Sequence, residues 1–232
     1  MRPEAEPERG RVFTEALTPG IADATASGRV RLDAIARWLQ DVAFHDLLDA
    51  GFEEAGVWIV RRCRITVDSF PRFGERLDLR TFCSGLGRFS AERRTAISGG
   101  SAAVDAVALW IWLEAETLRP LRFPLSFVDL YGESAGGRGA GVRLRHPDPP
   151  SDADRTPFAF RVADLDVAGH VNNSHYWAAL EQELAGAEPE RFDAEIEYRE
   201  PAEPGEVTIL GAGERRWITA DGRVRASIVQ LA

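Results

Sequence analysis

One stretch of the sequence gathers side chains suited to hydrolytic chemistry. Residues 164–176 include two carboxylates, two histidines, two adjacent asparagines and a glycine. A carboxylate or an imidazole can take a proton from water as a general base, and a neighbouring amide can orient that water. Asp166 and His170 are the candidates for the base, with Asn172 and Asn173 as the amides beside it. These residue types suit a site where water attacks a polarised carbonyl group.

The same stretch lies where a strand is expected to lead into a helix. Gly169 permits a tight turn, and the unpaired N–H groups at the start of a helix suit a carbonyl oxygen or an oxyanion. The alternative is structural, because Asp and Asn commonly cap helices and Gly commonly forms turns. The residue types alone leave the catalytic and the capping explanations equally open.

The elements that position this stretch follow from the spacing of apolar residues. These residues recur at helical spacing over 31–48, and Gly51 follows as a stop signal. Alternating patterns predict antiparallel strands over the rest of that half. Residues 134–153 are rich in Gly, Arg and Pro and are predicted to be a linker. Beyond it, a strand, a helix over 172–185 and further strands repeat the architecture without an obvious repeat of sequence.

This order of elements predicts the α+β class, with two similar halves. We expect an N-terminal half at residues 12–133 and a C-terminal half at residues 154–232, joined by the linker at 134–153. Each half would place one long helix against an antiparallel sheet.

Composition narrows the function classes. A net charge of -9 argues against a nucleic-acid binder, but it leaves room for an acidic partner protein that meets a local basic patch. No apolar run reaches the roughly 18 residues that a membrane span needs. Because residues 1–11 lack an apolar signal core, we expect a cytoplasmic protein. Cys63 and Cys83 form no disulfide framework and have no metal-type spacing, so no metal is expected.

The string from Asp166 through Gly169-His170-Val171-Asn172-Asn173 to Tyr176 resembles the motif that opens the central helix of hotdog thioesterases. With Asp164 and Leu165 included, it is most similar to the second half of plant and bacterial acyl-carrier-protein (ACP) thioesterases. Motifs of the first half occur in that family's order: Leu39-Gln40-Asp41-Val42-Ala43, Asp49-Ala50-Gly51-Phe52, Trp58-Ile59-Val60, Phe70-Pro71 with Gly74-Glu75, Gly87-Arg88, Trp110 and Thr117-Leu118-Arg119-Pro120. The likeness covers nearly the whole chain.

The resemblance implies a double hotdog whose N-terminal half shapes an acyl pocket and whose C-terminal half supplies catalysis. The implied activity is hydrolysis of fatty acyl thioesters, acyl-ACP first, releasing free fatty acid in fatty-acid biosynthesis without a cofactor. The expected partner is ACP, or acyl-CoA as the substrate, and a homodimer is compatible with the resemblance. Two alternatives stay open: an acyl-CoA thioesterase, and a non-catalytic acyl-binding hotdog protein.

Residue by residue, Asp166 and His170 match the family's catalytic Asp and His. Between them the family usually has an Asn, where this chain has Ala168. The family also has a Glu just after the strand that holds Tyr198. An ungapped match puts Pro201 there, and a shift of one residue makes Glu200 the counterpart. We therefore predict Asp166, His170 and Glu200 as catalytic residues.

Substrate binding is assigned to Gly169, Asn172 and Asn173 at the helix start and to Trp38 on the first helix. Trp38 is also a candidate for the plain core, since large aromatics on such a helix commonly lie there. Glu181 lies near the position where some hotdog enzymes use a Glu, and the alternative is an ordinary salt-bridged residue.

Three arginines alternate along one expected strand. Arg61, Arg62 and Arg64 either meet an acidic carrier protein or form a solvated strand face. His170 and His175 are five residues apart, which places them about 140° apart around a helix, so a shared metal site is not expected.

Overall fold

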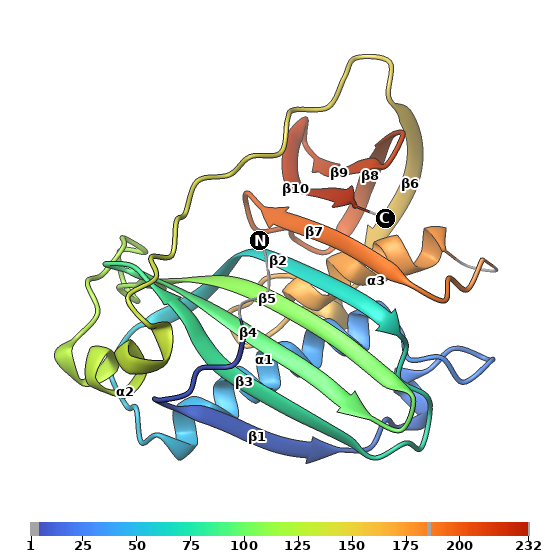
Figure 1. Ribbon diagram of the computed structural model, residues 1–232. Helices are drawn as coiled ribbons and strands as arrows, with labels where there is room; N and C mark the ends of the chain where they lie inside the picture. The colour runs from blue at the N-terminus through green and yellow to red at the C-terminus, as the bar shows by residue number, and fades with distance from the viewer. Residues whose placement is uncertain (1–4, 185–186, 232) are drawn as a thin grey trace.

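The computed structural model describes residues 5–184 and 187–231 (Figure 1). The N-terminal half contains β1 (Val12–Leu17), α1 (Leu32–Asp49), β2 (Val57–Ser69), β3 (Leu77–Leu86), β4 (Ser90–Gly99), β5 (Ala102–Leu113) and α2 (Leu125–Ala135). The C-terminal half contains β6 (Asp154–Phe160), α3 (Asn173–Glu183), β7 (Phe192–Tyr198), β8 (Gly205–Ala212), β9 (Arg215–Ala220) and β10 (Arg223–Gln230). A short 3-10 turn precedes each long helix, at Ile21–Asp23 and at Val162–Asp164.

The strands form one antiparallel sheet in the order β1-β3-β4-β5-β2-β7-β10-β9-β8-β6. The halves meet where β2 pairs with β7, from Arg62 opposite Glu197 to Val67 opposite Phe192. The sheet curves around α1 and α3, which pack against each other on its inner side (Figure 1). Two central helices, α1 of 18 residues and α3 of 11, are wrapped by antiparallel strands, which confirms the α+β double hotdog.

The apolar periodicity of α1 buries Leu32, Ile35, Leu39 and Val42 in a core that is shared by the two halves. Trp38 lies in this same core with 6% of its surface exposed. The observed helix runs one residue later than the expected 31–48, a shift within the usual uncertainty of helix ends.

Two elements were absent from the sequence prediction. β1 pairs with β3 at the edge of the sheet. α2 spans only 11 residues and buries Phe127 and Tyr131, one turn apart, against the first half. It ends at Gly136 in a left-handed conformation (φ 57°), so the first two residues of the expected linker are helical.

Residues 136–153 contain no helix or strand, and they run along the protein from α2 to β6 (Figure 1). Their backbone is tied to the sheet: Ala140 O accepts from Ser90 Oγ at 2.8 Å, and the N–H groups of Arg145 and His146 donate to Glu197. The linker is therefore held at the β2–β7 junction. The boundaries of the two domains stay a prediction.

Truncating Ile196 tests the dependence of the fold on this junction. Its fully buried side chain lies on β7, opposite Cys63 of β2 and Ile228 of β10. Ile196→Ala is expected to lower the free energy of unfolding by about 2–5 kcal/mol, because it opens a cavity between the halves. Urea unfolding followed by circular dichroism measures the change. Ile21→Ala, at a position 86% exposed, is the control and should change the free energy of unfolding by less than about 0.5 kcal/mol. Equal losses in the two variants would contradict the dependence of the fold on the β2–β7 junction.

Candidate active site

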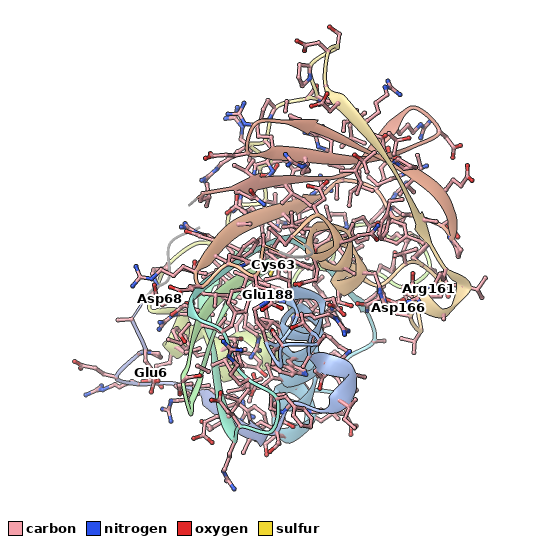
Figure 2. All side chains as sticks on the ribbon, turned by 90° about the vertical axis from the view of Figure 1, so that its right-hand side faces the viewer. Glu6, Cys63, Asp68, Arg161, Asp166 and Glu188 are labelled. Carbon is pink, nitrogen blue, oxygen red and sulfur yellow. The ribbon has the colours of Figure 1, made fainter. Side chains whose placement is uncertain are left out.

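A tight turn presents Asp166 beside the start of α3. The N–H of Asp166 donates to His170 O, and the N–H of Gly169 donates to Asp166 O, both at 3.0 Å. Gly169 has a φ of 77°, a left-handed conformation that a residue with a Cβ adopts only at a cost. Figure 2 shows Asp166 close to Arg161 at the end of β6. The glycine predicted for a turn is thus required there by its backbone conformation.

The Asp166 carboxylate is held by two hydrogen bonds. Oδ1 accepts from the N–H of Ala168 at 2.9 Å, and Oδ2 accepts from Nδ2 of Asn172 at 3.1 Å. Asn172 is also the N-cap of α3, because its Oδ1 accepts from the N–H of Ser174 at 2.9 Å. Asn172 thus caps the helix through Oδ1 and donates to the Asp166 carboxylate through Nδ2, while its role in substrate binding stays a prediction.

A cavity of about 490 Å³ opens next to this carboxylate, between α1 and strands β2–β5. Its wall is formed by Arg37, Gln40, Asp41, Ala43, Phe44, Leu47, Trp58, Cys83, Ala91, Glu92, Arg93, Trp110, Phe127, Asp166, Val167 and Asn172. Most of these side chains come from the N-terminal half, whereas the last three come from the C-terminal half. The aromatic and aliphatic groups suit an apolar chain, with Asp166 and Asn172 available to a polar head. A larger pocket, of about 770 Å³ between β6, β8 and β9, contains none of the predicted site residues.

The other predicted site residues are not part of this cavity wall. His170 follows Asp166 in the turn with 44% of its side chain exposed, and its Nε2 is 3.9 Å from Glu203 Oε1. Asn173 is the first residue of α3, and its carbonyl accepts from the Tyr198 hydroxyl at 3.1 Å. Trp38 does not line the cavity; it packs in the main core, whereas Trp58 and Trp110 do line it.

Glu200 is not brought to Asp166. Its carboxylate lies 2.8 Å from Arg225 and 3.7 Å from Arg223, in a separate pocket. The loop after β7 is pinned at Ala202, whose N–H donates to the Tyr176 hydroxyl at 3.0 Å. Glu203 follows this anchor and faces His170 instead.

Glu181 forms a buried ion pair with Arg29 and accepts from the N–H of Leu32 at 3.0 Å. It is thus the salt-bridged residue that the sequence offered as an alternative. The arginines of β2 are likewise engaged at the junction. Arg62 is buried, and Arg64 pairs with Asp193 at 2.6 Å.

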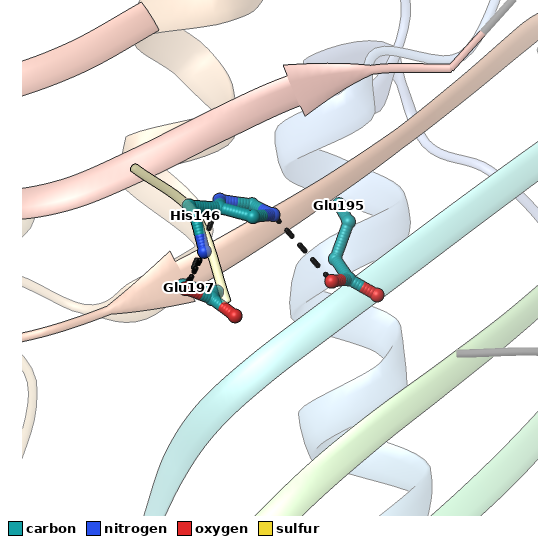
Figure 3. A group of neighbouring side chains, drawn as sticks. All are labelled: His146, Glu195 and Glu197. Atoms are coloured by element: carbon teal, nitrogen blue, oxygen red, sulfur yellow. Dashed lines mark hydrogen bonds and ion pairs between the residues drawn. The ribbon is translucent and has the colours of Figure 1, made fainter. Parts of the chain in front are cut away.

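A histidine and two glutamates gather at the same junction (Figure 3). Ligand atoms of His146, Glu195 and Glu197 lie within 4.8 Å of one another, the only such group found among residues 5–184 and 187–231. Both Glu197 oxygens already accept backbone N–H groups, at 2.7 and 2.9 Å. The Arg62 guanidinium lies 3.8 Å from Glu197 and 4.0 Å from Glu195, so this cation already offsets part of the charge of the two carboxylates. The geometry therefore fits a cluster that holds the linker against the sheet better than it fits a metal site.

Comparison with known proteins agrees with this geometry. Residues 10–131 match the model of the acyl-ACP thioesterase N-terminal domain, and residues 148–216 match that of the C-terminal domain. The chain belongs to the acyl-ACP thioesterase family. Membership confirms the resemblance seen in the sequence and makes the protein a thioester hydrolase, consistent with an apolar cavity that ends at a carboxylate.

Relatives of this acyl-ACP thioesterase family member are distant in sequence. An uncharacterized protein of Mycobacterium tuberculosis is 28% identical over 204 residues, which cover 86% of this chain and 82% of the relative. An acyl-ACP thioesterase from Bacteroides thetaiotaomicron has the same fold, with a TM-score of 0.77, 19% identity and coverage of 94% and 96%. The 12:0-ACP thioesterase from Umbellularia californica gives a TM-score of 0.76, 17% identity and coverage of 96% and 97%.

Of the helices in the described residues, α1 is the longest with 18 residues, and none combines the length and apolar character of a membrane span.

Cys83 lines the cavity, but its thiol is not activated. Burial raises the pKa of Cys83 to about 11, and its Sγ is 3.3 Å from Gly85 O.

In a Cys63→Ala background, iodoacetamide should therefore label Cys83 of the folded protein slowly at pH 8. The rate should climb as the pH approaches 11, since the thiolate fraction at pH 8 is about 200-fold below that of a thiol with a pKa near 8.5. Labelling of the guanidinium-unfolded protein is the control; equally fast labelling in both states would contradict the raised pKa.

Proposed function

We propose that this protein hydrolyses fatty acyl-ACP thioesters and releases free fatty acid in fatty-acid biosynthesis. The observation that carries the proposal is the apolar cavity of the N-terminal half, with Asp166 and Asn172 of the other half at its wall. An acyl chain fits the aromatic wall, and its thioester would lie at the carboxylate. Family membership and the likeness to two solved proteins, an acyl-ACP thioesterase and a 12:0-ACP thioesterase, support a carrier-linked substrate.

In the proposed reaction Asp166 takes a proton from water while the water oxygen attacks the thioester carbonyl carbon. The carbonyl would lie by the turn at Gly169 and His170, beside the Asp166 carboxylate. The carbon–sulfur bond then breaks, the fatty acid stays in the cavity, and the thiolate of the carrier takes the proton that Asp166 removed from the water. No metal or cofactor is needed because a thioester is already activated toward water.

Two alternatives differ in what they need from the structure. An acyl-CoA thioesterase would use the same cavity and base with another leaving group. A non-catalytic acyl-binding protein would keep the cavity and lose the chemistry, as Ala168 and Pro201 suggest. The two hydrogen bonds that orient the Asp166 carboxylate favour the catalytic explanation. The cytoplasmic location and the homodimer stay predictions.

Replacing Asp166 tests the base. The wild-type protein is assayed on medium- to long-chain acyl-ACP and acyl-CoA, with Asp166→Asn and His170→Ala alongside. Turnover should favour acyl-ACP, and Asp166→Asn should lower kcat by about 10²–10⁴, because the amide cannot take the proton. Preference for acyl-CoA would select the first alternative. Acyl chains that bind without turnover would select the second.

A matched pair of glutamates tests the predicted third catalytic residue. Glu200→Gln removes the carboxylate that faces Arg225, whereas Glu203→Gln removes the one beside His170. If the loop contributes through His170, Glu203→Gln should lower kcat severalfold and Glu200→Gln should leave it unchanged. Steady-state kinetics on acyl-ACP measures both. A loss confined to Glu200→Gln would restore Glu200 as the catalytic carboxylate.

A further inference from the structure

The two halves carry the same turn before their long helices. Residues 20–32 align with residues 161–173 without a gap, and four positions are identical. The identical pairs are Ala22 and Ala163, Asp23 and Asp164, Gly28 and Gly169, and Val30 and Val171. The structure thus reveals a repeat of sequence where the sequence alone indicated a repeat of architecture only.

The backbone hydrogen bonds of the two turns correspond one by one. In each turn the Asp carboxylate accepts from the N–H three residues before it, at 2.7 Å in the first half and 2.8 Å in the second. Its carbonyl accepts from the N–H eight residues later, at 2.9 Å in both. The crossing bonds also match: Thr25 N to Arg29 O is 2.7 Å, and Asp166 N to His170 O is 3.0 Å.

Each turn also meets the ninth residue of the helix from the opposite half. Gln40 of α1 contacts Asn172 beside the second turn, with its Nε2 3.0 Å from Asn172 Oδ1. Glu181 of α3 contacts Arg29 in the first turn and the N–H of Leu32. Gln40 and Glu181 therefore occupy equivalent places.

The chemistry of the two places differs. In the first turn, the positions of Asp166 and His170 are taken by Thr25 and Arg29. Arg29 is only 4% exposed, and its guanidinium, which lies 4.7 Å from the Phe70 ring centre, is neutralised by the buried Glu181. This turn is locked by an ion pair, so its helix residue has a structural task.

In the second turn an amide pair replaces the ion pair. Gln40 and Asn172 exchange hydrogen bonds, since Nδ2 of Asn172 lies 3.3 Å from Gln40 Oε1. The same Nδ2 lies 3.1 Å from Oδ2 of Asp166. Gln40 lines the cavity with both residues. A residue of the N-terminal half thus reaches the candidate base of the C-terminal half through one intermediate side chain.

We propose that Gln40 is a positioning residue for the hydrolysis. This inference rests on the proposed function. It fixes the Asn172 amide so that Nδ2 faces the carboxylate of Asp166, while Oδ1 stays on Ser174. A neutral amide is needed in this place. A carboxylate like that of Glu181 could not donate to Asn172 Oδ1, and its negative charge would oppose ionisation of Asp166.

Gln40→Glu, which is nearly isosteric, tests the proposal on acyl-ACP. We expect kcat to fall by up to about 100-fold through misplacement of the base, with KM close to wild type. We also expect the acidic limb of the kcat/KM profile to move up by about one pH unit, because the added carboxylate favours protonation of Asp166. Gln40→Met, which keeps the volume without hydrogen bonds, should lower kcat without this shift in pH.

Glu181→Gln is the matched control at the equivalent place. It should lower the melting temperature, because buried Arg29 loses its counter-charge, and leave kcat and the pH profile unchanged. Gln40 variants with a lower melting temperature but wild-type kcat and pH profile would overturn the proposal for Gln40. The proposed hydrolysis would still hold if Asp166→Asn is inactive. A wild-type protein that hydrolyses no thioester would overturn both.

Discussion

The pairing of β2 with β7 joins two similar halves into one protein. Because this pairing continues the sheet across the halves, α1 and α3 face a single core. The cavity depends on the same contact, since its apolar wall comes from the N-terminal half and its carboxylate from the C-terminal half. Neither half alone contains both the apolar wall of the cavity and the candidate base.

Buried charge marks this junction, and its arrangement explains why it is tolerated. Arg62 of β2 lies near Glu195 and Glu197 of β7, and the linker adds His146 and two backbone N–H groups. Burying unpaired carboxylates would be costly, so the linker must follow one path to satisfy them. Burial raises the pKa of Glu195, but the hydrogen bond from His146 and the charge of Arg62 help bring it to about 2. The Glu195 carboxylate thus stays charged at neutral pH.

The duplicated turn shows how one backbone arrangement supports two tasks. Both copies have the same pattern of hydrogen bonds before a central helix. Each copy is contacted by a helix residue of the opposite half. A buried ion pair closes the first copy at Arg29, whereas neutral amides leave Asp166 at the cavity wall in the second. The difference lies in side-chain charge, not in the fold.

Local patterns determined much of this protein. Apolar periodicity defined α1 and α3, and the residue types at 164–176 located the turn with Asp166, because helices and tight turns depend on neighbours in the chain. Tertiary structure alone decided the rest. It buried Trp38 in the core, turned Glu200 toward Arg225 and brought Gln40 to Asn172, 132 positions along the chain. Such contacts depend on how the halves pack together, and no spacing within one segment encodes them.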